Sequence, residues 1–338
     1  MFLLLIIRTQ KVAFISLTQV IFMSHIINQL RKNGVMYYCI KYFVGRPFHL
    51  LKYAYYLFWE LVDKDAITVS ACISPSRGYY KFTNNNWGDD VSLIIAALVS
   101  KRRIIPYQYS LFSRYGKKKN YLCIGSIIPW LIHKRSIVWG SGIGVSSLEM
   151  ELKPLEIFSV RGPLTREYFL KKGLDCPAVY GDPALLFPLF YSPVMKKKYK
   201  IGIILHYNDC IERNYKILSE YSKEDVCLIS LDSYNNWKYF IDAVCSCDFI
   251  LSTSLHGVII ADTYSVPNIW CEFTYRVEEN GLKFRDYYLS VGKEFTEPVL
   301  KVDHYISINS LLEYKKVWTA NRIDLNAILS ACPFRKKN

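Results

Sequence analysis

Six short segments of this chain combine residues that bind anions, bind hydroxyl groups or transfer protons. The most distinctive, residues 252–257, reads STSLHG and opens an apolar run at Val258. A histidine in the first turn of a helix lies beside amide N–H groups without partners inside the helix, and such a helix start binds anions. The helix dipole disfavours imidazolium there, whereas a bound anion favours it. We therefore predict that His256 changes protonation state during turnover, as an acid–base catalyst must. A purely structural histidine is the alternative.

A second segment, residues 160–165 (VRGPLT), places Arg161 at the end of a predicted strand and just before a predicted helix. Pro163 suits the first position of that helix, and Gly173 suits its end. Ligands of open α/β sheets bind at the carboxyl ends of strands, and an arginine holds a carboxylate or phosphate through two parallel hydrogen bonds. Arg161 is therefore predicted to bind an anion. A structural arginine that bonds loop carbonyls stays open as the alternative.

Residues 84–90 (NNNWGDD) precede another helical pattern, which extends to Ser100. Asp89 is predicted to cap this helix, with Asp90 near its positive end. Trp87 could stack on a sugar face while Asn86 and the aspartates bind hydroxyl groups. Capping explains one aspartate and leaves the rest of the cluster open to a binding function.

Two further segments follow predicted strands. Residues 139–144 (WGSGIG) contain glycines that let a backbone approach a ligand and present N–H groups to an anion. Their G-x-G-x-G spacing departs from the dinucleotide-binding fingerprint, so a simple tight turn remains the alternative. In residues 181–186 (GDPALL), a capping role is favoured for Asp182 over catalysis.

The sixth segment, residues 283–288 (KFRDYY), carries cationic side chains, with Arg276 upstream. This segment lacks a regular pattern and is interpreted as a loop that closes over an anionic ligand, or as an ordinary charged loop. His206, at the end of another predicted strand, is a second candidate at the same edge of the sheet.

Short apolar runs alternate with helical patterns from about residue 66 onward. The predicted strands cover residues 67–73, 121–127, 136–139, 157–160, 178–180, 200–206, 226–231, 249–252 and 268–273. The predicted helices cover residues 90–100, 163–172, 237–246, 256–265 and 310–329. This alternation predicts an α/β protein with parallel sheets. The Pro- and Lys-containing stretch 188–200 divides it into an N-terminal α/β domain (36–192) and a C-terminal α/β domain (193–338) with a cleft between them.

The composition favours anionic partners other than nucleic acid. Of the 338 residues, 51% are hydrophobic, which allows one large or two medium domains, and the formal net charge is +14. Because no nucleic-acid motif or long basic helix occurs in the sequence, phosphorylated ligands and a membrane surface are the better partners. The ten cysteines form no C-x-x-C pair, so we predict reduced thiols and no metal site.

The first 60 residues carry two interpretations. Residues 1–35 are an extension of unassigned structure: either they lie on a membrane, or the natural chain begins at Met36. Residues 36–60 mix aromatic and basic side chains, which suits a membrane interface and equally suits an ordinary first helix packed on a core.

In their order and spacing, these segments resemble the polysaccharide pyruvyl transferase family. The resemblance covers roughly residues 80–290 and rests on residues 86–89, 140–142, 160–165, 181–184, 254–257 and 259–262. It implies two Rossmann-like domains facing a cleft, similar to the GT-B glycosyltransferases. It also implies that phosphoenolpyruvate donates its pyruvyl group to a sugar of a surface polysaccharide, capsule or exopolysaccharide, or to the lipid-linked precursor, forming a ketal. No cofactor is implied beyond phosphoenolpyruvate as co-substrate.

By this resemblance, Arg161 matches the family's donor-binding arginine and His256 its catalytic histidine. We assign His256 to protonation of the enol carbon and Asp89 to the acceptor hydroxyl. The expected donor-binding residues are Arg161, Ser254, Leu255, Gly140, Ser141, Gly142, Lys283 and Arg285. The expected acceptor-binding residues are Asn86, Trp87 and Asp90, and a second tier comprises His206, Arg276 and Asp182.

One departure from the family concerns Ser254, where many members carry arginine. Either Lys283, Arg285 or Arg276 supplies the missing positive charge, or the donor binds differently than in those members. Two other functions stay open: a GT-B glycosyltransferase that uses a nucleotide sugar, and a non-catalytic glycan-binding protein. The expected location is the cytoplasm, at the inner face of the cell membrane, with peripheral association to lipid.

Overall fold

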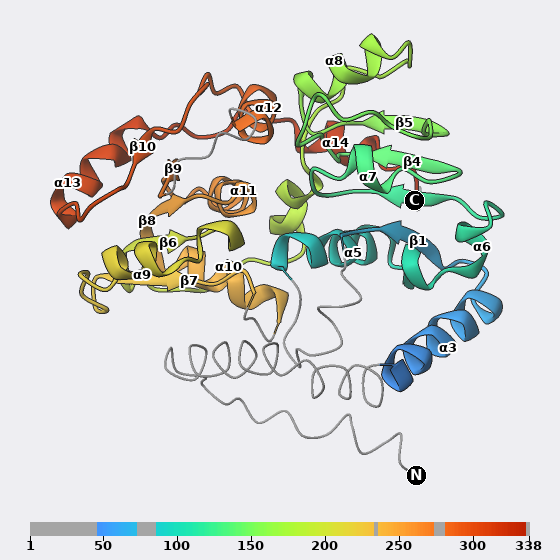
Figure 1. The fold of residues 1–338 in the computed structure, drawn as a ribbon, viewed down its shortest axis with the longest axis horizontal. Helices are drawn as coiled ribbons and strands as arrows, with labels where there is room; N and C mark the ends of the chain where they lie inside the picture. The colour runs from blue at the N-terminus through green and yellow to red at the C-terminus, as the bar shows by residue number, and fades with distance from the viewer. Residues whose placement is uncertain (1–45, 73–85, 233–235, 274–280, 336–338) are drawn as a thin grey trace. The chain divides into compact units, whose positions relative to one another are not determined.

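The computed structural model describes residues 46–72, 86–232, 236–273 and 281–335, with side chains from residue 50 onward. The chain divides into two compact units, residues 1–51 and 52–338, and both of its β-sheets belong to the second unit (Figure 1). The predicted extension 1–35 and Arg276 lie outside the described residues.

The first sheet has five parallel strands in the order β2-β1-β3-β4-β5. They are β1 (Ile67–Ser70), β2 (Ile104–Pro106), β3 (Asn120–Leu122), β4 (Ser136–Trp139) and β5 (Glu156–Ser159). The helices of this half are α3 (Arg46–Val62), α5 (Trp87–Ser100), η2 (Tyr107–Tyr109), α6 (Leu111–Arg114), α7 (Ile128–Leu131), α8 (Pro163–Lys171) and η3 (Pro183–Leu189). Strands β1 and β4 are buried along their whole length, as expected of parallel strands covered on both faces.

The second sheet repeats this plan with five parallel strands in the order β10-β9-β8-β6-β7. They are β6 (Tyr199–Ile204), β7 (Val226–Ile229), β8 (Cys247–Ser252), β9 (Asn268–Glu272) and β10 (Leu300–Lys301). Its helices are η4 (Tyr207–Asp209), α9 (Glu212–Leu218), α10 (Trp237–Cys245), α11 (Leu255–Thr263), α12 (Leu282–Ser290), α13 (Ile308–Glu313), η6 (Tyr314–Val317) and α14 (Leu325–Ser330).

Both sheets therefore have the doubly wound strand order 2-1-3-4-5 when their strands are counted along the chain. In such a sheet the strand order reverses between the first and third strands, and ligands bind outside the carboxyl ends of the strands at that point. The two reversal points lie between β1 and β3 and between β6 and β8. The predicted α/β class with parallel sheets is confirmed.

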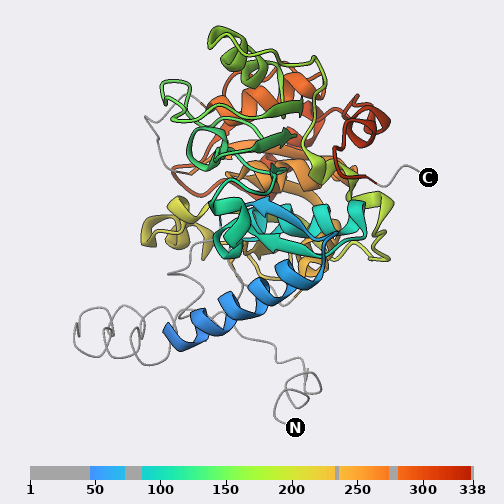
Figure 2. The same ribbon diagram turned by 90° about the vertical axis from the view of Figure 1, so that its right-hand side faces the viewer.

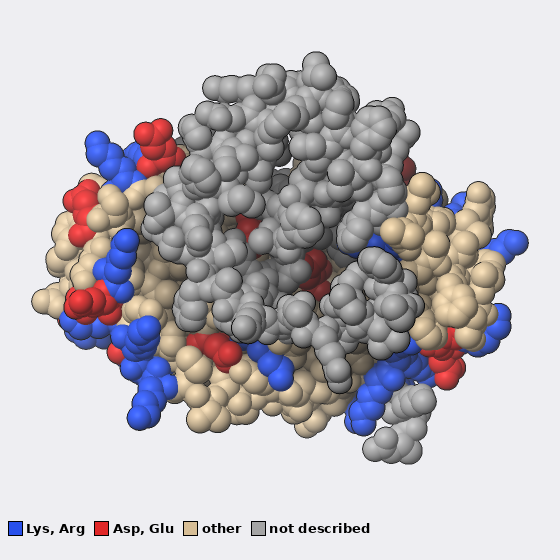
Figure 3. Space-filling model, turned by 90° about the horizontal axis from the view of Figure 1, so that it is seen from below, with Lys and Arg blue, Asp and Glu red and all other residues tan. Residues whose placement is uncertain are grey.

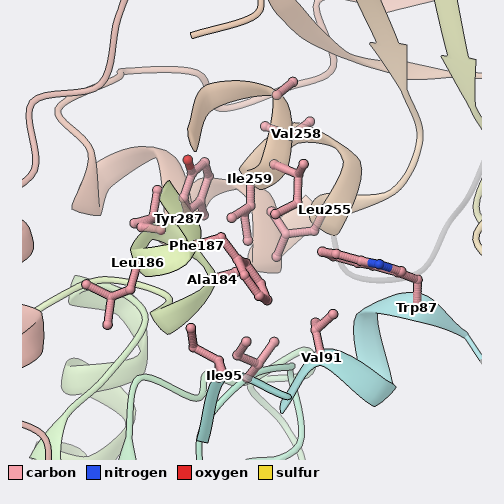
Figure 4. Close-up of a cluster of buried hydrophobic side chains, with 14 of the residues drawn as sticks. Trp87, Val91, Ile95, Ala184, Leu186, Phe187, Leu255, Val258, Ile259 and Tyr287 are labelled. Carbon is pink, nitrogen blue, oxygen red and sulfur yellow. The ribbon is translucent and has the colours of Figure 1, made fainter. Parts of the chain in front are cut away.

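The hydrophobic core is continuous between the two halves of the chain. Figure 4 shows Trp87 of α5, Phe187 of η3, Leu255 of α11 and Tyr287 of α12 in one buried cluster. Helix α5 follows strand β1 of the first sheet, whereas α11 and α12 follow strands β8 and β9 of the second. The division into domains at residue 192 stays a prediction.

Several element assignments from the sequence are wrong. The single helix expected over residues 310–329 is broken into α13, η6 and α14. The segment 283–288, interpreted as a loop, lies inside α12, and the short strands β2 and β10 were missed. Helix α14 packs on the first sheet, because Trp139 donates its indole N–H to the carbonyl of Ile328 at 2.9 Å.

One face of helix α3, which is blue in Figure 2, contacts residues 109–111, which follow strand β2. Tyr56 stacks on Tyr109 with ring centroids 5.1 Å apart, and the buried carboxylate of Glu60 accepts hydrogen bonds from Ser110 and from the amide of Leu111. No helix in the described part of the chain is both long and apolar enough to cross a membrane. Basic and acidic side chains are interspersed over the described surface in Figure 3.

Candidate functional site

The candidate site is centred on the start of α11, at the strand-order reversal of the second sheet. Helix α11 begins at Leu255, directly after the loop that leaves β8. His256 lies in its first turn, as the sequence predicted. Ser254 occupies the N-cap position, and its side chain makes no capping hydrogen bond within the described structure.

Hydroxyl groups instead fix the loop that precedes the helix. Ser252 accepts a hydrogen bond from the amide of Ser254 and donates one to its carbonyl, at 3.1 and 2.8 Å. Thr253 accepts from the amide of His206 at 2.8 Å and donates to the carboxylate of Asp209, so this loop is joined to the chain that leaves β6. Gly257 completes the fit, because a Cβ atom there would lie 2.3 Å from Oγ of Ser252.

This arrangement leaves an anion-binding helix start. Within the described chain, the amides of Leu255, His256 and Gly257 have no hydrogen-bond acceptor. The first three N–H groups of a helix carry its partial positive charge, and they bind a phosphate or carboxylate when no side chain caps them.

The imidazole of His256 is held neutral beside these amides. Its Nε2 atom is buried and has no hydrogen-bond partner among the described residues, although the residue as a whole keeps some exposure. Burial and then the positive charges of Lys283 and Arg161 lower the pKa of His256 to about 3. A buried polar atom without a partner is costly, and it points to a ligand that completes the site.

The start of α5 lies directly against this histidine. A Cβ atom on Gly88 would lie only 2.0 Å from Nδ1 of His256, so the absence of a side chain lets the imidazole approach the helix. The helix cap is Asn86, whose side chain accepts from the amide of Gly88 at 3.0 Å. The prediction that Asp89 is the cap is therefore wrong; Asp89 and Asp90 are partly buried in the first turn.

Trp87 has a packing position. It is fully buried, its indole N–H donates to the carbonyl of Trp237 at 2.9 Å, and its ring lies 4.5 Å from that of Phe240. Because the side chain is 0% exposed within the core, its ring is closed to a sugar in this arrangement.

Arg161 is completely buried in an ion pair. Its guanidinium contacts Asp286 at 3.0 Å, and donates to Ser126 and to the carbonyl of Ile143 at 2.6 Å each. Thr165 also binds Asp286, through its amide at 2.9 Å and its hydroxyl at 2.7 Å. The contacts of Arg161 are thus those of a structural arginine, the alternative to anion binding. To contact the donor directly, its guanidinium would have to leave Asp286.

The glycine-rich segment supports this ion pair. A Cβ atom on Gly142 would lie 2.4 Å from the guanidinium carbon of Arg161, and Gly140 has a positive φ of 88°. The amides of Gly140 and Gly142 already donate to the carbonyls of Ser159 and Gly125, so neither is presented to an anion. Ser141 keeps a buried hydroxyl without a partner in the described structure, as does Ser159 at the end of β5.

Helix α12 brings cationic groups to the site. Lys283 lies close enough to His256 for its charge to lower the pKa of the imidazole. Arg285 is partly buried, and its Nε atom has no hydrogen-bond partner in the part of the chain that the structure describes. Asp286, on the same helix, anchors α12 to the first half of the chain through Arg161.

Asp182 has the predicted capping role and a perturbed acidity. Its Oδ1 accepts from the amide of Ala184 at 2.9 Å at the start of η3, and its Oδ2 has no partner within the described residues. Burial raises the pKa of Asp182 to about 7, against the opposing effects of the Ala184 amide and Arg161. His206 lies two residues beyond β6, and its backbone amide supports Thr253.

The sequence did not reveal the roles of Gly88, Thr165, Ser126 or Asp286. The glycine and the aspartate occurred inside selected segments, but nothing in their spacing showed that they contact His256 and Arg161. Thr165 also belonged to a selected segment, residues 160–165, but was given no role of its own there, and Ser126 carried no signal beyond its predicted strand.

Comparisons with known proteins agree with the motifs. Residues 38–273 match the family described as polysaccharide pyruvyl transferase. The chain is 27% identical over 219 residues to the succinoglycan biosynthesis protein ExoV of Rhizobium meliloti (strain 1021), which covers 63% of this chain and 64% of that protein. The chain thus spans just under two thirds of the length of this curated relative.

Two further similarities were found. The uncharacterized protein L143 of Acanthamoeba polyphaga mimivirus is 25% identical over 206 residues, covering 59% of this chain and 69% of that protein. A crystal structure of a functionally uncharacterized protein, KP1_0663, from Klebsiella pneumoniae subsp. pneumoniae NTUH-K2044 is 16% identical, with a TM-score of 0.38. It covers 70% of this chain and 92% of that one. A TM-score this low does not establish a shared fold.

Proposed function

Because this chain belongs to the polysaccharide pyruvyl transferase family, we propose that it is a transferase that moves the pyruvyl group of phosphoenolpyruvate to a sugar hydroxyl pair, forming a ketal. The acceptor is a surface polysaccharide or its lipid-linked precursor. The resemblance to ExoV, a protein named for succinoglycan biosynthesis, supports an exopolysaccharide. The arrangement of the two sheets around a cleft, as in GT-B glycosyltransferases, is part of this proposal, and no cofactor is needed.

The donor binds at the start of α11. Its phosphate accepts hydrogen bonds from the unpartnered amides of Leu255, His256 and Gly257, and Lys283 balances its charge. Lys283 thereby replaces the positive charge that Ser254 lacks, with Arg285 on the same helix as a second cation. Arg161 holds α12 in place through Asp286.

The reaction starts with a proton on His256. The imidazole is neutral in the free protein because burial and two cations lower its pKa, and the negative charge of the donor reverses that effect. The imidazolium then protonates the methylene carbon of phosphoenolpyruvate, and a sugar hydroxyl adds to the neighbouring carbon and loses its proton. Phosphate leaves with the electron pair of the C–O bond, the second hydroxyl adds, and its proton is lost in turn. One hydroxyl proton restores the acid and the other leaves on hydrogen phosphate.

The acceptor lies beside the start of α5. Asp89 and Asp90, in its first turn, orient or deprotonate the hydroxyls next to Gly88 and His256. A base in position to take the hydroxyl proton contributes about 10²–10⁴-fold.

The proposed location is the cytoplasmic face of the membrane, without a role for nucleic acid. The outward face of α3 supports it, because Tyr55, Phe58 and Val62 are 52–59% exposed and three or four residues apart. This apolar stripe and the net charge of +14 favour an anionic lipid surface. Sedimentation with vesicles of anionic lipid tests this: Phe58→Glu should reduce binding, whereas Leu170→Glu on α8 should not.

The observation that carries the proposal is the buried, unpartnered Nε2 of His256 at an uncapped helix start. The test is phosphate release from phosphoenolpyruvate, with lipid-linked oligosaccharides from membranes as acceptor. His256→Gln should lower acceptor-dependent release by about 10²–10⁴-fold. His304→Gln, at an exposed histidine, is the matched control and should retain full activity.

Product mass separates the proposal from its alternatives. A glycan heavier by one ketal-linked pyruvate supports pyruvyl transfer. Consumption of a nucleotide sugar without phosphate release from phosphoenolpyruvate contradicts it and supports a glycosyltransferase. Glycan binding without either reaction contradicts it in favour of a binding protein.

A further inference from the structure

A small pocket opens at the carboxyl edge of the second sheet, on the side of β6 and β7. Its walls come from Leu205, from Tyr207 and Cys210 after β6, from Tyr215 of α9 and from residues 228–232 at the end of β7. The cavity measures about 50 Å³ and is open to solvent on one side. That volume has room for an exocyclic group of a sugar, since about 10–15 Å³ of such cavity volume is enough for one water molecule.

The wall chemistry suits a neutral polyhydroxylated ligand. Tyr207 and Tyr215 are 47% and 42% exposed, so each presents aromatic surface at the mouth. Asp232 is partly buried, and its carboxylate accepts no hydrogen bond from the described residues. Aromatic faces cover the C–H surface of a sugar ring, and a carboxylate accepts hydrogen bonds from its hydroxyls.

The same chemistry is unsuited to the anionic donor. No lysine or arginine is among the described residues that line the pocket, and its one charged group is a carboxylate. Lys283, the stronger of the two cationic influences on His256, belongs to α12, which follows β9. Because the strand order is β9-β8-β6-β7 and α11 follows β8, the cationic helix and the pocket lie on opposite sides of His256.

The pocket is also joined to the catalytic histidine. Its wall residue Leu231 accepts the amide N–H of Trp87 at 2.7 Å through its carbonyl. Trp87 is followed by Gly88, on which His256 packs. The wall of the pocket is thus hydrogen-bonded to the first residue of α5, the helix whose second residue contacts His256.

We infer that this pocket is the acceptor subsite, where one neutral sugar of the glycan stacks on Tyr207 and Tyr215 and binds Asp232 through its hydroxyls. The inference rests on the proposed function. It assigns the aromatic contact with the sugar to Tyr207 and Tyr215 in place of Trp87. Donor and acceptor then approach His256 from opposite sides of β8.

A labelling experiment tests occupancy without requiring turnover. Cys210 is an exposed thiol in the pocket wall, and Cys72 is an exposed thiol outside it. The rate of maleimide modification of each is followed by peptide mass spectrometry, with the lipid-linked oligosaccharides or phosphoenolpyruvate added. The oligosaccharides should slow labelling of Cys210 at least threefold and leave Cys72 unchanged, whereas phosphoenolpyruvate should slow neither. Equal labelling of Cys210 with and without the oligosaccharides, or protection by phosphoenolpyruvate alone, overturns the inference.

Kinetics provide the second arm. Tyr207→Ala and Asp232→Asn should each raise the acceptor KM about tenfold, the size expected for one lost hydrogen bond to a charged group or a lost stacking contact, with the phosphoenolpyruvate KM unchanged. Tyr239→Ala, at a tyrosine 55% exposed on α10, is the matched control. If the wild type releases phosphate but neither variant alters the acceptor KM, the subsite is refuted and the pyruvyl transfer stands. If the wild type transfers no pyruvate while the oligosaccharides still protect Cys210, the proposed reaction fails and the glycan site stands.

Discussion

Gly88 and His256 belong to different halves of the chain, yet the imidazole of His256 packs directly on the α-carbon of Gly88. A Cβ atom on Gly88 would lie 2.0 Å from Nδ1 of the histidine, closer than real Cβ contacts allow. This contact brings the start of α5, which follows strand β1 of the first sheet, against the start of α11, which follows strand β8 of the second.

We expect Gly88→Ala to displace the imidazole of His256. The variant should therefore lose a larger share of its transferase activity than of its free energy of unfolding. Overpacking of this kind costs about 1–3 kcal/mol. In a His256→Ala background the added methyl group has room, so Gly88→Ala should destabilise much less there. Urea unfolding of the wild type, the two single variants and the double variant gives the coupling free energy between positions 88 and 256. Equal destabilisation in both backgrounds would show that the clash is not with His256.

Binding of phosphoenolpyruvate should take up a proton. His256 is neutral at neutral pH because its pKa is lowered to about 3, and the negative charge of the donor raises that pKa. Calorimetry at pH 8, in two buffers with different ionisation enthalpies, measures the protons bound. We expect uptake by the wild type of up to about one proton and none by His256→Gln. Identical heats in both buffers for the wild type would contradict this protonation.

Lys283→Met should raise the pKa of His256 and weaken donor binding. The positive charge of Lys283 is the second cause, after burial, of the lowered histidine pKa. Imidazole NMR titration and the KM for phosphoenolpyruvate measure the two effects. Lys171→Met, at an exposed lysine on α8, should change neither. An unchanged imidazole titration in Lys283→Met would show that the two charges do not interact.

Asp182→Asn should stabilise the protein more at pH 8 than at pH 5.5. Burial raises the pKa of the Asp182 carboxyl from 3.8 to about 7. Between these two pH values the folded state binds more protons than the unfolded state, so the protein loses stability as the pH rises toward 7. The difference between the two pH values should be about 2 kcal/mol in urea unfolding. Asp324→Asn is the matched control, since Asp324 makes the same capping bond on an exposed helix start. A stabilisation that does not vary with pH would exclude the raised pKa.

Asp286→Ala should destabilise the protein by about 3–5 kcal/mol, because it leaves the buried guanidinium of Arg161 without its carboxylate. Glu167→Ala removes the exposed partner of Lys171 and should cost about 0.5 kcal/mol or less. Thermal unfolding compares the two. Similar effects for both variants would mean that the buried pair is not a structural link between α12 and the first half of the chain.

The sequence by itself determined the fold class and the family. Apolar runs bounded by Gly, Pro and Ser predicted parallel strands, because these signals are local and a buried strand has few alternatives. His256 in the first helical turn, the capping role of Asp182 and the helix start at Pro163 are confirmed for the same reason. Each depends on a few neighbouring residues and on the hydrogen-bonding requirements of the backbone at a helix start.

Only the tertiary structure decided which partners these residues meet. Arg161 has the sequence context of an anion-binding residue, but Asp286, 125 residues away, neutralises it. Trp87 has the context of a sugar-stacking residue, but Phe240 and Phe187 cover it in the core. The start of α12 was not predicted, because no side chain caps it and Gly281 precedes it with a positive φ. Contacts between distant segments follow from packing of whole helices and sheets, and no local pattern encodes them.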